Sequence, residues 1–180
     1  MRSVLIAIQP KWCDLIASGK KTAEVRKTIP KTDLPFRCYI YCTKPPKGKA
    51  HMYDAFGFGN NPYDYGGKVI GEFVCTRYTF LGNVSTSEWK RLLGSTHDLL
   101  KRFVRERACL TEQELLDYGG KFAWHISDLV IYDKPKELSE FRSYFTRVFA
   151  GDDGLPLPTH EIKKPPQSWC YVEECKEVSK

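Results

Sequence analysis

Three charged side chains lie at short intervals near the N-terminus. They are Lys21, Glu24 and Arg26, within a G-x-K-x-x-E-x-R pattern that begins at Gly19. Glu24 and Arg26 are two residues apart, so on a β-strand they share a face and can pair or contact one ligand together. The planar guanidinium of Arg26 suits a phosphate group or the edge of a base. The pattern favours a binding site for such a ligand, and the alternative is a strand-edge salt bridge without a ligand.

Lys21 supplies a compact cation near this pair, but its orientation is open. Strict alternation along a strand places Lys21 on the face opposite Glu24. Either the strand begins after Lys21 or a bulge turns the lysine inward, and the sequence allows both.

Glu72 is a second candidate acid, within the apolar stretch Ile70–Val74. A carboxylate among apolar neighbours is costly to bury unless it is paired, and Lys21 or Arg26 is a suitable partner. Such an acid is a candidate general base. If Phe73 faces the core instead, Glu72 faces water and carries no chemistry.

Other polar and aromatic side chains are weaker candidates. Tyr39 and Tyr41 share a strand face and form either a stacking surface for bases or part of the core. His125 is a hydrogen-bonding candidate or a structural histidine. One predicted helix carries four basic residues, Lys101, Arg102, Arg105 and Arg107. They either extend a phosphate-binding surface or are simply solvated. The cysteine spacings are not those of zinc sites, so we expect no metal. The sequence has no Gly-Lys-Ser/Thr phosphate-binding loop, Rossmann fingerprint or nucleophile elbow, and we expect no cofactor.

The charge of the chain is unevenly distributed. Residues 1–50 carry eleven basic side chains and three acidic ones, a net charge of +8, whereas the other 130 residues sum to about −2. A basic segment on a nearly neutral body favours a polyanionic partner such as nucleic acid, and a solvated lysine-rich surface is the alternative.

The length and composition indicate a folded domain. The chain has 180 residues, 42% of them apolar or aromatic, which excludes disordered, collagen-like and coiled-coil classes. The apolar run at Val4–Ile8 is too short for a secretory signal or a membrane span. Seven cysteines, an odd number, then favour free thiols in a reducing compartment. We therefore expect a cytoplasmic protein without a membrane partner.

Alternating and helical patterns predict the elements that position the candidate residues. Strands are predicted at Val4–Ile8, Thr22–Arg26, Phe36–Thr43, Val69–Phe80, Phe122–Tyr132 and Ser168–Glu173. Helices are predicted from Pro10 to Gly19, after the capping box at Ser85, around Leu99–Val104, from Thr111 to Gly119, and from Phe141 to Phe149. The mixture lacks a regular strand–helix alternation, so the fold class is α+β with a curled, mixed or antiparallel sheet. The segment from Lys44 to Gly67 and the one from Gly151 to Pro166 are predicted loops, and aromatic side chains in the first can stack on bases or cover the core.

The motif, with the strand and helix that precede it, resembles the ASCH domain (activating signal cointegrator homology) of the PUA-like superfamily. The resemblance is closest over residues 3–29 and continues weakly through Val69–Thr76 and Phe122–Tyr132. The stretch Pro166–Tyr171 is similar to longer bacterial and phage-type members. Relative to a minimal ASCH domain, residues 1–180 form one domain with a helical insertion at about 81–120 and a C-terminal extension at about 133–180.

The resemblance implies a small mixed β-barrel with flanking helices and a cleft lined by the motif. RNA or a modified nucleoside or nucleotide is the implied ligand. The residues that we expect to bind it are Lys21, Glu24, Arg26, Lys11, Tyr39, Tyr41 and His125. A third interpretation makes the helical insertion a protein-interaction surface and the motif only structural.

An enzymatic role is the alternative to simple binding. Some ASCH proteins are amidohydrolases that deacetylate acetylated cytidine with a lysine, a threonine and a glutamate. Lys21 matches that lysine, but Glu24 occupies the position of the threonine, and Thr22 is displaced along the strand by about 7 Å. An enzyme acting on a modified nucleoside or on RNA would instead use Lys21 with Glu24 or Glu72 as an acid–base pair.

Overall fold

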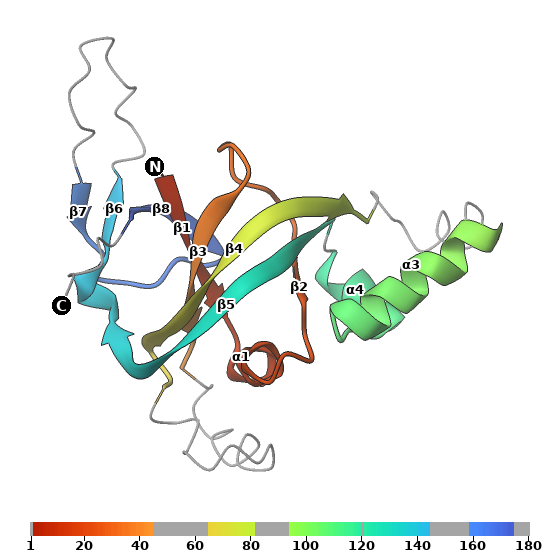
Figure 1. Ribbon diagram of the computed structural model, residues 1–180, viewed down its shortest axis with the longest axis horizontal. Helices are drawn as coiled ribbons and strands as arrows, with labels where there is room; N and C mark the ends of the chain where they lie inside the picture. Colours follow the sequence, from red (N-terminus) through yellow and green to blue (C-terminus); the bar gives the residue numbers. More distant parts are fainter. Residues whose placement is uncertain (1, 45–64, 82–93, 120, 145–158, 175–180) are drawn as a thin grey trace, which may run out of the picture.

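The structure is a computed structural model that describes residues 2–44, 65–81, 94–119, 121–144 and 159–174. The described residues form a single mixed sheet with the strand order β2-β5-β4-β3-β1-β8-β6-β7 (Figure 1). Its strands are β1 (Arg2–Ile8), β2 (Ala23–Arg26), β3 (Phe36–Cys42), β4 (Lys68–Phe80), β5 (Phe122–Glu137), β6 (Arg142–Tyr144), β7 (Thr159–Glu161) and β8 (Trp169–Glu173). The helices are α1 (Pro10–Ala17), α3 (Gly94–Arg107), α4 (Glu112–Tyr118) and the 3₁₀ turn η4 (Leu138–Glu140). The predicted α+β class is confirmed.

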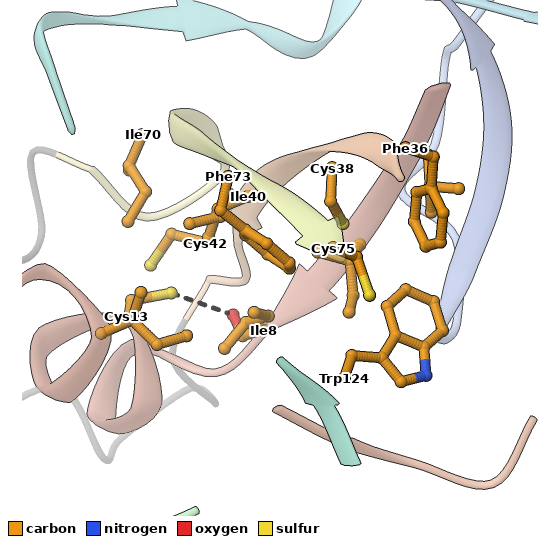
Figure 2. Close-up of a cluster of buried hydrophobic side chains, with 13 residues drawn as sticks. Ile8, Cys13, Phe36, Cys38, Ile40, Cys42, Ile70, Phe73, Cys75 and Trp124 are labelled. Carbon is orange, nitrogen blue, oxygen red and sulfur yellow. Dashed lines mark hydrogen bonds between the residues drawn. The ribbon is translucent and has the colours of Figure 1, made fainter. Parts of the chain in front are cut away.

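Strand β1 lies in the middle of the sheet and is buried on both faces. It pairs in parallel with β3 and antiparallel with β8. Val4 and Ile6 belong to the core cluster drawn in Figure 2, and Leu5 belongs to a second cluster on the opposite face. A strand covered on both faces is a continuous apolar run rather than an alternating one, which explains the sequence at Val4–Ile8.

Helix α1 covers the first of these clusters directly after β1. Pro10 starts the helix, where its missing N–H and fixed φ are tolerated, and Cys13 and Ile16 are buried against the sheet. The helix ends at Ala17, and Gly19 adopts a φ of +72° that favours glycine. The chain then enters β2 only at Ala23.

Helices α3 and α4 form a separate small core with β2 and β5. Val104, Ala108 and Leu115 are buried there against Ala23 and other strand residues. Thr111, where the sequence predicts the start of this helix, caps α4 with a capping box, in which its hydroxyl accepts from the N–H of Glu114, 3.1 Å away. Figure 1 shows both helices at one end of the molecule, with β6 and β7 at the other end. They fall within the predicted insertion at 81–120, whose status as an insertion remains a prediction.

One predicted helix is wrong over the residues that the structure describes. Instead of a helix starting at Phe141, the chain has the turn η4 followed by strand β6, which pairs with β7 and β8. Phe141 is buried, and its ring centre lies 5.0 Å from that of Tyr39. Pairing with two strands far along the chain thus overrides the helical spacing of the aromatic residues. Residues 145–149 lie outside the described residues, as do the capping box at Ser85 and most aromatic residues of the first predicted loop.

Two further observations concern the whole described chain. The six cysteines within it form no disulfide. None of its helices has the length and apolar character needed to cross a membrane.

Candidate functional site

A cavity of about 930 Å³ lies at the edge of the sheet where β1 and β3 end. These strands are parallel, so their carboxyl ends meet at one edge, and Ile8 and Thr43 both line the cavity. The first turn of α1, the residues of α4 and the segment before β8 form its walls. We call this space the motif cavity, because Lys21, Glu24 and Arg26 all line it.

The three motif side chains form one buried ion-pair network. Glu24 Oε1 lies 3.0 Å from Arg26 Nη2, and Glu24 Oε2 lies 3.4 Å from Lys21 Nζ. The side chains of Lys21, Glu24 and Arg26 are 2%, 8% and 7% exposed, so the network is far more buried than an ordinary surface pair. With two cations and one carboxylate, the network carries a net charge of +1.

Lys21 reaches this network because β2 begins after it. Its own N–H donates to the carbonyl of Leu15, 2.8 Å away, so the backbone is still attached to the end of α1. The strand therefore starts after Lys21, which is the first of the two arrangements that the sequence allowed, and not the bulge. The ammonium donates to the carbonyl of Ala108, contacts Glu24 and lies 5.0 Å from the centre of the Trp12 ring. The ammonium thus contacts a carbonyl acceptor, a counter-ion and an aromatic ring, which links α1, β2 and the residue after α3.

Arg26 is less completely satisfied. Its Nη2 donates to the carbonyl of Ala7, 2.7 Å away, and forms the ion pair with Glu24. Its Nε is buried and has no hydrogen-bond partner among the described residues. A buried donor without a partner costs about 1–3 kcal/mol, so the guanidinium of Arg26 is not fully paired. Because Nε itself is enclosed by protein atoms, other parts of the Arg26 side chain line the motif cavity.

Aromatic rings and charged side chains form the walls of the cavity. Trp12 of α1 and Tyr118 of α4 both line it. Lys11 Nζ lies 4.2 Å from the centre of the Trp12 ring and 3.0 Å from Glu114 Oε1, an ion pair that joins α1 to α4. Lys27 Nζ lies 5.3 Å from the centre of the Tyr118 ring. Two ammonium groups thus lie near the Trp12 ring and one lies near the Tyr118 ring, and both rings offer aromatic surface to a nucleobase where they line the cavity.

Glu114 is electrostatically stabilised at this wall. The N–H of Thr111 donates to Glu114 Oε2 at 2.9 Å, and this hydrogen bond, with a further contribution from Lys11, lowers the pKa of the Glu114 carboxyl. The carboxylate therefore both caps α4 and holds Lys11.

Glu72 does not join the motif, which corrects one sequence expectation. It pairs with Arg37 and accepts a hydrogen bond from the hydroxyl of Tyr132 at 2.5 Å. Phe73, its neighbour, is fully buried in the core that α1 covers. Alternation along β4 therefore directs Glu72 to the other face of the sheet, away from Lys21 and Arg26.

Tyr39 and Tyr41 likewise belong to the core and not to a ligand surface. They are 0% and 4% exposed and lie in the cluster that contains Leu5 and Phe141. Their shared face of β3 is covered by other elements, so no base can stack on them. His125 is half-buried outside the motif cavity, and its Nε2 lies 2.7 Å from Thr79 Oγ1. The pKa of His125 is lowered mainly by burial and further by the positive charges of two nearby arginines.

The remaining predicted residues do not line the motif cavity. Lys11 does not line the cavity itself but contacts Trp12 and Glu114, which do. Arg102 and Arg105 of the basic helix are 67% and 77% exposed. Lining residues that the sequence did not identify are Lys44, Asp117, Tyr118, Pro165 and Gln167. No local spacing connects them to the motif. Among the described residues, no three His, Cys, Asp or Glu side chains form a group suited to a metal ion.

Comparisons with known proteins agree with this architecture. A scan against protein-family models finds no match. The chain is 41% identical over 46 residues to a curated protein of Zymomonas mobilis named ASCH domain-containing ribonuclease. The match covers 26% of this chain and 31% of the relative, so the chain spans about a third of the length of that protein.

The similarity in structure extends over nearly the whole chain. The crystal structure of the ASCH protein of Zymomonas mobilis has a TM-score of 0.54 at 23% identity and covers 96% of this chain and 88% of that one. Two mutants of the same protein give TM-scores of 0.55 and 0.54 at 23% and 24% identity, again over 96% of this chain. The fold is thus an α+β mixed sheet with flanking helices. The comparisons confirm the resemblance to the ASCH domain, and the chain has the ASCH fold.

Proposed function

We propose that the chain is an RNA-binding ASCH domain that holds an unpaired nucleotide in the motif cavity. The observation that carries the proposal is the nearly buried guanidinium of Arg26, which lines a cavity of about 930 Å³ and whose donors are not all paired among the described residues. A phosphate oxygen or a base-edge acceptor in the cavity pairs with the part of the guanidinium that lines it. The volume lies within the range of small-molecule and nucleotide sites.

The other lining residues have complementary roles in this proposal. Trp12 and Tyr118 stack on the base, and the basic N-terminal segment attracts the phosphate backbone. Glu24 orients Arg26, to which it is paired at 3.0 Å, and Lys21 holds the network in place. The relative named a ribonuclease supports RNA as the ligand class.

Conservative substitution of Arg26 tests this assignment. Arg26→Lys keeps a cation beside Glu24 but removes Nε and the planar fork. We expect a loss of about 10-fold or more in affinity for single-stranded RNA, measured by fluorescence anisotropy at low salt, because a charge-assisted hydrogen bond contributes about 1.5–3 kcal/mol. Arg37→Lys is the matched control, because Arg37 pairs with Glu72 away from the cavity. Absence of RNA binding by the wild type, or equal affinity of the Arg26→Lys variant, rules the proposal out.

RNA cleavage is a second candidate function, favoured by the name of the relative and by the adjacency of Glu24 and Lys21. In such a reaction the 2′-hydroxyl gives its proton to Glu24 and attacks the phosphorus, and the bond to the 5′-oxygen breaks. Lys21 donates a proton to that leaving oxygen, and Arg26 neutralises the phosphate. Glu72 has no part, since it lies on the other face.

Cleavage is tested with RNA and with RNA that has a 2′-deoxy nucleotide at each position. We expect cleavage of the first only, and its loss in Glu24→Gln. Intact RNA after prolonged incubation leaves the binding function alone. Hydrolysis of acetylated cytidine has less support, because the threonine close to Lys21 in sequence, Thr22, is not among the residues that line the cavity.

A further inference from the structure

A second cavity, of about 600 Å³, lies at the end of the sheet formed by β6, β7 and β8. We call it the edge cavity. Its lining includes Ser143, Glu161, Lys163, Lys164 and Cys170. Pro166 lines both this cavity and the motif cavity, so the two spaces adjoin.

The segment between the two cavities is fixed at both ends. The N–H of Ile162, a residue only 6% exposed, donates to the carbonyl of Phe141 at 3.2 Å. At the other end, the carbonyl of Ser168 accepts from the N–H of Ala7 at 2.8 Å. Two consecutive prolines between these anchors, at 165 and 166, restrict the backbone further. The segment therefore forms a rigid ridge from one cavity to the other.

The ridge carries two neighbouring cations. Lys163 and Lys164 are exposed, and neither forms an ion pair with an acidic residue among the described residues. Three residue steps separate Lys164 from Gln167, which lines the motif cavity, a span of at most about 11 Å. A nucleic-acid strand that leaves the motif cavity over Pro166 thus passes both ammonium groups.

We propose that the edge cavity is a second subsite for the same RNA strand, in which Lys163 and Lys164 contact the phosphates of nucleotides next to the one in the motif cavity. The inference rests on the proposed function, since it extends that site to a longer ligand. An extended single strand matches the geometry better than a duplex does, because the two cavities are hollows joined over a narrow ridge. Site sizes of about four or more nucleotides are common for single-strand binding surfaces.

The dependence of affinity on RNA length tests this inference. The probes are a fluorescein-labelled uridine dinucleotide and a uridine oligonucleotide of about eight residues. The variants are Lys163→Ala/Lys164→Ala and, as a control that removes the same charge, Arg102→Ala/Arg105→Ala. The control residues are exposed on α3, at the opposite end of the molecule (Figure 1).

We expect the lysine variant to bind the dinucleotide like the wild type, which also shows that it is folded. For the longer probe, loss of two phosphate contacts makes the slope of log K against log salt less steep by about 1.4. If the lysine variant and the wild type bind equally at 1 M salt, this difference in slope makes the affinity of the variant about 25-fold lower than that of the wild type at 0.1 M salt. The arginine variant is expected to retain wild-type affinity for both probes.

Three results overturn the inference. In the first, the wild type binds both probes equally. In the second, the lysine variant keeps its affinity for the longer probe. In the third, the lysine and arginine variants lose the same affinity, which indicates a diffuse charge effect. All three leave the motif cavity as a nucleotide site, whereas failure of the wild type to bind either probe overturns the proposed function as well.

Discussion

Removal of the Glu24 carboxylate is the perturbation whose effect the structure determines most directly. Glu24 is the sole acid of its network and lies between two buried cations, at 3.0 Å from Arg26 and 3.4 Å from Lys21. Glu24→Ala leaves both cations in place, less than a tenth exposed and without their shared counter-ion. The backbone carbonyls of Ala7 and Ala108 still accept from them, but carry no full negative charge.

The expected loss of stability is large. Removing one partner of a buried ion pair costs about 3–5 kcal/mol, because the charge that remains is uncompensated. In a domain of this size, each kcal/mol lowers the melting temperature by about 2–4 °C, so Glu24→Ala lowers it by about 6–20 °C.

Urea unfolding followed by circular dichroism measures this loss, with the slope of free energy against urea checked for constancy. The matched control is Glu106→Ala, which removes a carboxylate 47% exposed from its pair with Arg102 on α3. We expect the control to lose less than about 1 kcal/mol. If Glu24→Ala loses no more than the control, the network does not stabilise the fold and our reasoning about its burial is wrong.

Three further predictions concern residues outside the network. His125 has a pKa lowered from its ordinary 6.5, chiefly by burial, so the folded state binds fewer protons than the unfolded one, and stability falls as the pH drops through 6.5. In His125→Gln this decline between pH 7 and 6 disappears from unfolding curves, and an unchanged decline contradicts the assignment. The pKa of the Glu114 carboxyl is lowered, so the wild type is more stable than Glu114→Gln above pH 4.5. This difference in the free energy of unfolding disappears as the pH falls through the folded-state pKa, and thermal melts across this range detect it. Phe141→Ala removes a buried ring packed against Tyr39 and costs about 3–5 kcal/mol in urea unfolding, whereas a loss below 1 kcal/mol contradicts the assignment of Phe141 to the core.

Local patterns in the sequence predicted most of the described elements. The capping box at Thr111 and the proline and glycine that flank α1 each act within one turn of a helix, so their effect does not depend on the rest of the fold. The three motif residues converge on one cavity for a similar reason. Lys21, Glu24 and Arg26 are separated by five positions at most, and a strand that begins at Ala23 is sufficient to bring them together.

The errors arise where the decisive contacts are remote in sequence. Alternation showed that Tyr39 and Tyr41 share a face, but both faces of this sheet are buried, so alternation alone does not identify the face nearer the ligand. Glu72 had the same ambiguity, and Arg37 on the adjacent strand decided it. The cavity wall at Tyr118 exists because α4 packs near α1. The ion pair that joins the two helices links Lys11 to Glu114, about 100 residues later in the sequence, and no local spacing encodes such a contact.

The motif network has a structural and a functional role that an apolar replacement can separate. In the triple variant Lys21→Met/Glu24→Leu/Arg26→Met no buried charge remains, and such replacements are often neutral or stabilising by about 1–4 kcal/mol. Against this gain, the carbonyls of Ala7 and Ala108 lose their donors, at about 1–3 kcal/mol each. The midpoints of these ranges, a gain of about 2.5 and a total loss of about 4 kcal/mol, leave a net loss of about 1.5 kcal/mol, so we expect the triple variant to be more stable than Glu24→Ala.

RNA binding distinguishes the two roles in this variant. If the network exists only to link α1, β2 and α3, the apolar variant keeps both its fold and its affinity for RNA. If Arg26 contacts the ligand, the variant keeps the fold, as circular dichroism and urea unfolding record, but loses the affinity that anisotropy measures. Arg26 lines the motif cavity, and its guanidinium is the part of the network whose donors are not all paired among the described residues. We expect the second outcome.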